Sequence, residues 1–180
     1  QNERIKKGLC EKYGIPQDSR IVLYAPTFRS NKSIEPYRID WNALLPSFRK
    51  VYGSDKVSIL VRLHPNLISR VDVGPLLNSP LVSDATRYHD MQELLSISDM
   101  LITDYSSVMF DYSILRRPMI FFMYDIEEYR GQLRDFYIEP DILPGPIVST
   151  QDEVEEEIEK AFSPEYVQDA RYEAFCEKFT

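Results

Sequence analysis

The chain has 180 residues, of which 43% are hydrophobic, and its formal net charge is −8. These values are ordinary for a globular domain with a sizeable core, and the acidic balance argues against a general nucleic-acid binder, which needs a basic face. No apolar run approaches the ~20 residues that cross a bilayer, and the charged start of the chain differs from a signal peptide. The chain opens without a methionine, as an excised piece of a longer protein would.

Apolar spacing and turn residues predict alternating helices and strands along the chain. In chain order we expect a helix around 5–13, a strand at 20–26, a helix over 41–51, a strand at 56–65, a short strand at 80–84, a helix around 91–95, a strand at 100–104, a helix over 106–115, a strand at 118–124, and helices near 151–162 and 164–178. This alternation predicts one α/β domain over residues 1–180. Its architecture is a Rossmann-like parallel sheet of five or six strands with helices on both faces.

Two further features of the composition carry expectations. Cys10 and Cys176 lie near opposite ends of the chain and match no metal spacing, so we expect two reduced cysteines rather than a disulfide. The acidic run "QDEVEEEIEK" at 151–160 is most simply a solvated helix face.

Polar residues follow the predicted strands at the edge where parallel α/β sheets bind their ligands. The expected site residues at these strand ends are Thr27, Arg29, Arg62, His64, Thr103, Asp104, Ser106 and Ser107. Each has a structural alternative: Thr27 and Arg29 can simply open a loop, His64 before a proline can be a turn residue bonded to backbone, and Asp104 or Ser106 can cap the next helix. His89 is expected to be a cap or a surface residue.

Together these residues suit a diphosphate. Backbone N–H groups at Ser106 and Ser107, at the start of a helix, can cradle phosphate oxygens. Arg29 or Arg62 can add a bidentate contact, and His64 can donate to a bridging or departing oxygen. Asp111, four residues beyond Ser107, either accepts from ribose hydroxyls or is a surface residue. The sequence contains no GxGxxG and no Walker glycine loop, and no cluster of carboxylates, cysteines or histidines indicates a metal site.

The motifs "YAPTFR", "RLHP", "SISDMLITDYSSVMFDY", "RRPMIFF" and "PGPIVST" occur in this order between about residues 20 and 158. This ordered set resembles the CDP-glycerol glycerophosphotransferases, the polymerases and primases of teichoic acid synthesis. The resemblance implies the second, nucleotide-binding half of a two-domain GT-B enzyme whose first half is absent here. The first half of the family carries a further catalytic histidine, a general base that nothing in this chain matches.

The resemblance also implies an activity. CDP-glycerol, or CDP-ribitol, docks on the "DYSS" helix; the acceptor hydroxyl attacks the β-phosphorus, CMP leaves, and a glycerol phosphate unit is added to a polyol-phosphate chain on a lipid carrier. His64 assists at the phosphates, and no cofactor is implied. The family further implies a cytoplasmic location, at the inner face of the cell membrane through the rest of the protein. The isolated chain is expected to be inactive.

Two alternatives remain at this point. A GT-B sugar-nucleotide glycosyltransferase shares the diphosphate seat, but it would release a nucleoside diphosphate and form a glycoside. A nucleotide-binding module without activity of its own would hold a ligand or partner only. The sequence leaves open whether the donor carries glycerol or ribitol.

Overall fold

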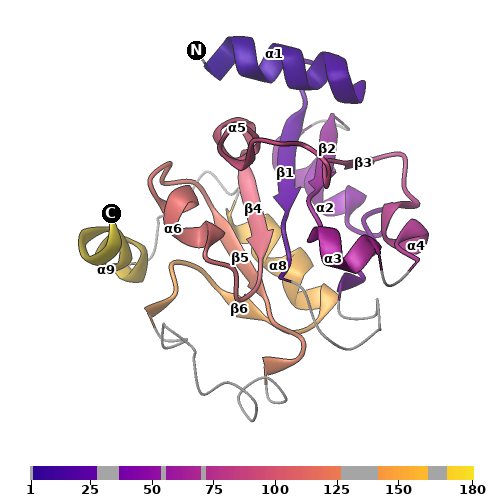
Figure 1. Cartoon of the computed structure of the whole chain (residues 1–180). Helices are drawn as coiled ribbons and strands as arrows, with labels where there is room; N and C mark the ends of the chain where they lie inside the picture. Colours follow the sequence, from indigo (N-terminus) through magenta and orange to yellow (C-terminus); the bar gives the residue numbers. More distant parts are fainter. Residues whose placement is uncertain (1, 28–36, 54–55, 70–71, 127–141, 162–169) are drawn as a thin grey trace.

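A parallel sheet organises the computed structural model, which describes residues 2–27, 37–53, 56–69, 72–126, 142–161 and 170–180 (Figure 1). Its strand order is β3-β2-β1-β4-β5-β6, and every neighbouring pair is parallel. The strands are β1 (Arg20–Tyr24), β2 (Val57–Val61), β3 (Val82–Asp84), β4 (Met100–Thr103), β5 (Met119–Phe122) and β6 (Ile147–Val148). The strand order reverses between β1 and β4, and such a switch point opens a crevice beyond the carboxyl ends of the two strands.

Helices cover both faces of this sheet. They are α1 (Asn2–Tyr13), α2 (Leu45–Tyr52), α3 (Pro65–Ile68), α4 (Gly74–Leu77), α5 (Met91–Ile97), α6 (Val108–Ser113), α8 (Gln151–Ala161) and α9 (Ala170–Phe179). Buried side chains of α1, α5, α6 and α9 pack with Ile21 and Leu23 of β1 on one face. Those of α2, α3, α4 and α8 pack with Val22 and Tyr24 on the other. Successive residues of a strand point to opposite faces, so an entirely apolar strand indicates two covered faces.

The Rossmann-like sheet with helices on both faces is confirmed, and so is the upper estimate of its strand number. Several predicted boundaries are wrong by a few residues. The predicted strand at 56–65 ends at Val61, because His64 and Pro65 begin α3. The predicted helix over 41–51 begins only at Leu45. The last predicted helix, 164–178, is described from Ala170 onward as α9, and its earlier residues lie outside the described part.

Both cysteines are buried free thiols, as expected. Cys10 lies in α1 and Cys176 in α9. Burial raises the pKa of the Cys10 thiol, which keeps it protonated and unreactive.

The acidic helix α8 is only partly the solvated face that its sequence predicts. The Glu155 carboxylate accepts from the Ser47 hydroxyl, and Glu159 pairs with Lys50 of α2. The opposite side of α8 is buried through Val154 and Ile158. Carboxylates of this acidic run therefore bind side chains of α2 as well as facing water.

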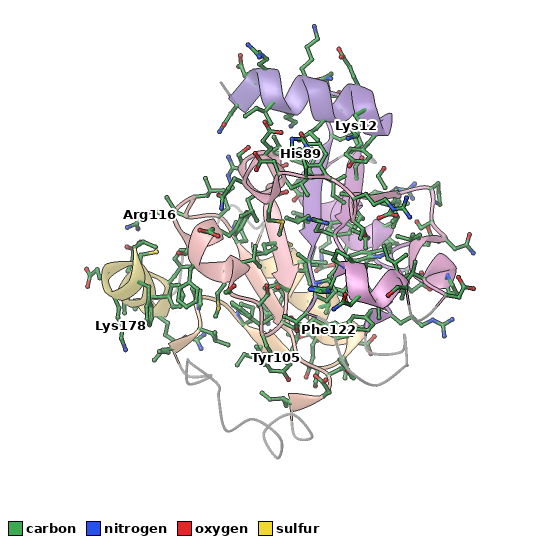
Figure 2. The ribbon with its side chains drawn as sticks, in the orientation of Figure 1. Lys12, His89, Tyr105, Arg116, Phe122 and Lys178 are labelled. Atoms are coloured by element: carbon green, nitrogen blue, oxygen red, sulfur yellow. The ribbon has the colours of Figure 1, made fainter. Side chains whose placement is uncertain are left out.

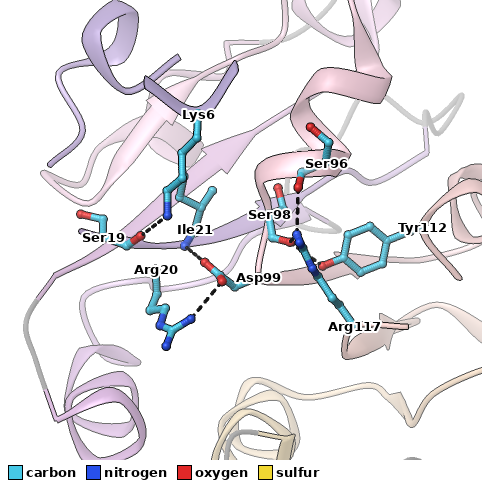
Figure 3. A network of polar contacts seen from close by, with 9 residues as sticks. All are labelled: Lys6, Ser19, Arg20, Ile21, Ser96, Ser98, Asp99, Tyr112 and Arg117. Atoms are coloured by element: carbon cyan, nitrogen blue, oxygen red, sulfur yellow. Dashed lines mark hydrogen bonds and ion pairs between the residues drawn. The ribbon is translucent and has the colours of Figure 1, made fainter. Parts of the chain in front are cut away.

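Polar contacts join the chain segments at the amino-terminal edge of the sheet (Figure 3). The Asp99 carboxylate, just before β4, accepts from the backbone N–H of Ile21 at 2.8 Å and from Arg20 Nη1 at 3.2 Å. Arg117 Nη1 donates to the carbonyls of Ser96 and Ser98 at 2.9 and 2.6 Å. These contacts fix the starts of β1 and β4 and the connection that precedes β5.

Among the described residues, no helix combines the length and the apolar character that crossing a membrane requires.

Candidate functional site

The candidate site lies at the switch point, where the ends of β1 and β4 are neighbours. β1 continues into Thr27, and β4 ends at Thr103 and continues into Asp104. The pairing of Tyr24 with Ile102 sets these two strand ends side by side. Thr27 and Asp104, which the sequence predicts after different strands, therefore lie at one edge.

Asp104 joins the two strand ends directly. Its Oδ1 accepts from the Thr27 backbone N–H at 2.9 Å and from Thr27 Oγ1 at 2.9 Å, and its Oδ2 lies 3.0 Å from the same N–H. Asp104 is only 3% exposed, and a buried carboxylate needs such donors to offset its desolvation. Thr103 is fully buried, and its hydroxyl donates to the carbonyl of Ala25 at 2.7 Å.

Thr103 and Asp104, for which the sequence predicts substrate contact, are buried and hydrogen-bonded within the protein, and the predicted contact stays a prediction. Both side chains point into the protein and tie β4 to the chain after β1. The alternative of Asp104 as a helix cap is wrong, because its carboxylate binds Thr27 rather than the first turn of α6.

Two serines stand between Asp104 and α6. The predicted helix over 106–115 is shorter, since α6 spans only Val108–Ser113. Ser106 is half-buried, and its Oγ accepts weakly from the Val108 N–H at 3.4 Å. Ser107 occupies the N-cap position, is exposed, and makes no capping bond with its side chain. The Ser107 hydroxyl is therefore exposed beyond the carboxyl end of β4, whereas the N–H groups of Val108, Met109 and Phe110 bond to Ser106 and Ser107.

A contact that the sequence did not predict holds this segment from its other side. The Tyr105 hydroxyl donates to Asp125 Oδ1 at 3.1 Å, and the Tyr124 hydroxyl donates to Asp125 Oδ2 at 2.8 Å. Tyr124 and Asp125 follow β5, while Tyr105 lies beyond the carboxyl end of β4 (Figure 2). The only available signal was a further polar cluster after a predicted strand. Hydrogen bonds of Asp104 and Tyr105 thus brace the segment 104–107, that is, they tie it to the chain after β1 and to the chain after β5.

His64 lies beyond the end of β2 and is exposed. Its Nδ1 accepts from the Asn66 N–H at 3.2 Å, which caps the short helix α3. A neutral imidazole that accepts at Nδ1 carries its proton on Nε2, so the other ring nitrogen is a donor. The structure therefore confirms the turn role of His64 bonded to backbone, and its role at the phosphates stays a prediction. β1 lies between β2 and β4, so the two strand ends are about 10 Å apart, two strand spacings.

Arg62 is half-buried beside His64, and its backbone N–H continues the β1–β2 ladder by donating to the Tyr24 carbonyl at 2.8 Å. Its side chain lines a cavity of about 580 Å³ at the ends of β2 and β3. The other walls of this cavity include Pro65, Ile68, Thr86, Arg87 and Tyr88. The wall is mainly apolar, and two of its residues, Arg62 and Arg87, are arginines.

The remaining predicted residues differ in what the structure says of them. Arg29 lies outside the described residues. Asp111 is exposed on α6, one turn after Ser107. His89 is exposed against the Tyr88 ring, with centroids 4.9 Å apart, and Asp90 rather than His89 caps α5. Among the described residues, no group of three or more histidines, cysteines and carboxylates is placed to hold a metal ion.

Residues 1–180 match the family described as CDP-Glycerol:Poly(glycerophosphate) glycerophosphotransferase. The chain belongs to this family. It is 38% identical over 181 residues to the teichoic acid poly(glycerol phosphate) polymerase of Bacillus subtilis (strain 168). This alignment covers 99% of this chain and 24% of that protein. It is 40% identical over 147 residues to the teichoic acid glycerol-phosphate transferase of Staphylococcus aureus (strain NCTC 8325 / PS 47), with 80% of this chain and 36% of that protein covered.

A solved structure gives the same result. The wall teichoic acid polymerase TagF superposes with a TM-score of 0.76 at 34% identity, over 99% of this chain and 43% of that chain. A variant of TagF solved after a soak with CDPG has the same TM-score and identity, over 99% of this chain and 42% of that chain. The chain thus spans less than half the length of these relatives, and its parallel sheet is the one that this part of TagF contains.

Proposed function

We propose that this chain supplies the donor site of an enzyme that transfers glycerol phosphate from CDP-glycerol to a polyol-phosphate acceptor, with release of CMP. One observation carries the proposal: the segment 104–107 is braced on both sides at the switch point of a sheet from the glycerophosphotransferase family. In this arrangement the diphosphate lies at Ser106 and Ser107. Asp104 and Thr103 hold that segment in place without touching the ligand.

The other residues take roles that follow from their chemistry. The Nε2–H of His64 donates to the phosphate oxygen on which charge grows as CMP leaves, and stabilising that charge lowers the barrier. Arg62, and Arg29 beyond the described residues, add charge-assisted contacts to the diphosphate. The largely apolar cavity beside Arg62 suits the flat cytosine ring, and Asp111 is placed to accept from ribose hydroxyls.

The reaction then balances as a phosphoryl transfer. A terminal hydroxyl oxygen of the acceptor attacks the β-phosphorus, the bond from that phosphorus to the bridging oxygen breaks, and CMP leaves with the electron pair. The hydroxyl proton passes to a base that we assign to the other half of a GT-B enzyme. The parent protein would work at the inner face of the cell membrane, where a lipid carrier presents the acceptor.

Titration of the chain with CDP-glycerol, CDP-ribitol, CMP and a UDP-sugar tests the donor site. We expect cytidine nucleotides to bind and to shift NMR signals of Thr27, Arg62, His64, Ser106 and Ser107. Preferential binding of the UDP-sugar would favour a glycosyltransferase, and shifts confined to α8 and α9 would overturn the site. The matched variants His64→Asn and His64→Ala separate the two roles of His64, because asparagine also caps helices.

An activity assay tests the division of the active site. The chain alone, with CDP-glycerol and a glycerol phosphate primer, should release no CMP, because a positioned base contributes ~100- to 10,000-fold and acceptor orientation accounts for ~7–11 kcal/mol of barrier lowering. Steady CMP release that His64→Asn abolishes would show that the site is complete within these residues.

A further inference from the structure

The segment that carries His64 is held both before and after this residue. After it, the His64 carbonyl accepts from the Leu67 N–H at 2.9 Å, and the His64 ring caps α3. α3 has only four residues, and a helix of this length is not stable by itself. The position of His64 therefore depends strongly on the contacts that hold the residue before it.

Thr86, in the loop after β3, supplies that contact. Its Oγ1 accepts from the backbone N–H of Leu63 at 3.1 Å, and Thr86 is only 2% exposed. Within the described part of the chain, no other acceptor binds the Leu63 N–H. Without the hydroxyl, this N–H would be buried and unsatisfied, which is costly enough to favour a shift of the chain that carries it.

The contact between Thr86 and Leu63 lies beyond the paired strands. The Ala85 N–H already extends the β2–β3 ladder by donating to the Val61 carbonyl at 2.8 Å. The Thr86 backbone is held in turn, because its N–H donates to Asp84 Oδ1 at 2.9 Å. The hydroxyl of a residue in a fixed turn thus fixes the chain immediately before His64.

The same arrangement occurs at another pair of strand ends. There Asp104, a buried residue, accepts from the Thr27 N–H just beyond β1, and the exposed Ser107 follows. Here a buried hydroxyl accepts from an N–H just beyond β2, and the exposed His64 follows. In both places a side-chain oxygen hidden from solvent holds a segment that carries an exposed polar group.

We propose that Thr86 is a positioning residue, whose hydroxyl sets the place of His64 relative to the phosphates of the donor. The inference rests on the proposed function, which gives His64 its contact with a phosphate oxygen. Thr86 itself touches no ligand in this arrangement. The tie matters because a misplacement of about 1 Å at a reacting group can cost about 100-fold in rate.

The test compares two substitutions at this position. Thr86→Val replaces the hydroxyl with a methyl group of similar size, and Thr86→Ser keeps the hydroxyl. CMP is titrated into the chain by calorimetry, and NMR follows the ring nitrogens of His64. In Thr86→Val the CMP affinity should fall about tenfold, the worth of a hydrogen bond to a charged phosphate, and the change that CMP causes in the His64 signals should be largely lost. Thr86→Ser should keep both.

Two further variants separate positioning from stability. Ser98→Ala removes another buried hydroxyl, which donates to the Leu94 carbonyl at 2.6 Å near the opposite edge of the sheet. It should lower stability but change neither the CMP affinity nor the His64 signals. The double variant His64→Asn/Thr86→Val should bind CMP as His64→Asn does, because a residue that acts only through His64 has nothing further to lose. A further loss of similar size in the double variant would overturn the proposal.

Hydrogen exchange of the original chain needs no variant. The Leu63 amide should exchange as slowly as the amides of β2, and exchange at the rate of an unprotected loop amide would overturn the proposal even if Thr86→Val fails to fold. CMP affinity and His64 signals that Thr86→Val leaves unchanged would overturn the positioning role alone. Absence of CMP binding by the original chain would overturn the proposed function and, with it, the role of Thr86.

Discussion

Strand β4 is bracketed by two aspartates, one at each edge of the sheet, and both bind the chain of β1. Asp99, before β4, accepts from the Ile21 N–H at the start of β1. Asp104, after β4, accepts from the Thr27 N–H just beyond the end of β1. The same device, a carboxylate that takes up a neighbouring backbone N–H, therefore fixes both ends of the central strand pair.

The two edges differ in what surrounds the aspartates. At the amino-terminal edge the nearby polar groups bind one another, as Arg117 binds backbone carbonyls of the turn before β4 (Figure 3). At the carboxyl edge the brace is equally internal, but Ser107 and His64 beside it are exposed. The comparison teaches that such a carboxylate contact alone marks no site, and that the exposed Ser107 and His64 are what make the carboxyl edge the candidate.

The largest effect is expected for Asp104→Asn. The new amide would set N–H against N–H at Thr27, so we expect a loss of about 2–4 kcal/mol in the free energy of unfolding, together with much weaker CMP binding. Thr27→Ala, which keeps the backbone bond, should cost about 1 kcal/mol, and Thr27→Ser should behave like the original protein. Denaturant melts and CMP titrations measure both quantities. An Asp104→Asn protein with unchanged CMP affinity would contradict the positioning role.

Asp99→Asn is the matched variant at the other edge. Asparagine keeps an oxygen that accepts from the Ile21 N–H but loses the exposed pair with Arg20, so the free energy of unfolding should fall by about 1 kcal/mol or less. Calorimetry should then find the same CMP affinity as for the original protein. Equal loss of CMP binding in the two aspartate variants would erase the distinction between the edges.

Ser107→Ala should act on binding alone. The Ser107 side chain is exposed and makes no capping bond, so the unfolding midpoint should stay the same. CDP-glycerol affinity should fall by about 1–3 kcal/mol, the contribution of a hydrogen bond to a charged phosphate. If binding is unaffected while stability drops, the serine is a cap and not a phosphate ligand.

The smallest effect is expected at Glu153, away from both edges. The backbone N–H groups of Ser149 and Thr150 donate to its carboxylate at 2.7 and 3.1 Å and lower the pKa of Glu153. A lowered folded pKa contributes stability above the unfolded pKa, and that contribution is lost as the pH falls through the folded value. Glu153→Gln should therefore be slightly less stable at pH 7 and indistinguishable in strong acid. Asp152→Asn, in the same first turn, is the control that removes a charge without these bonds.

The placement of several candidate-site residues at one edge could be predicted, because the residues that follow a strand are recognised from local sequence. Thr27, Arg62, His64 and Ser107 each follow an apolar run, and the rule for parallel sheets puts such residues at one edge. The roles of Thr103 and Asp104 could not be predicted in this way. Local sequence does not say whether a polar side chain faces a ligand or a neighbouring strand.

The contacts that decide those roles join distant parts of the chain. Asp104 and Thr27 are 77 residues apart, and Tyr105 and Asp125 are 20 residues apart. Such pairs form only after the strand order is set.

The sequence by itself determined the alternation of elements, the two covered faces of the sheet and the edge at which the candidate residues gather. These follow from periodicity and from the chemistry of single residues, which act over a few positions. The tertiary structure decided which carboxylate joins neighbouring strands and which hydroxyl stays exposed. Those outcomes depend on burial and on partners brought from elsewhere in the chain, since the energy of a charge or a hydrogen-bonding group is set by the groups packed around it.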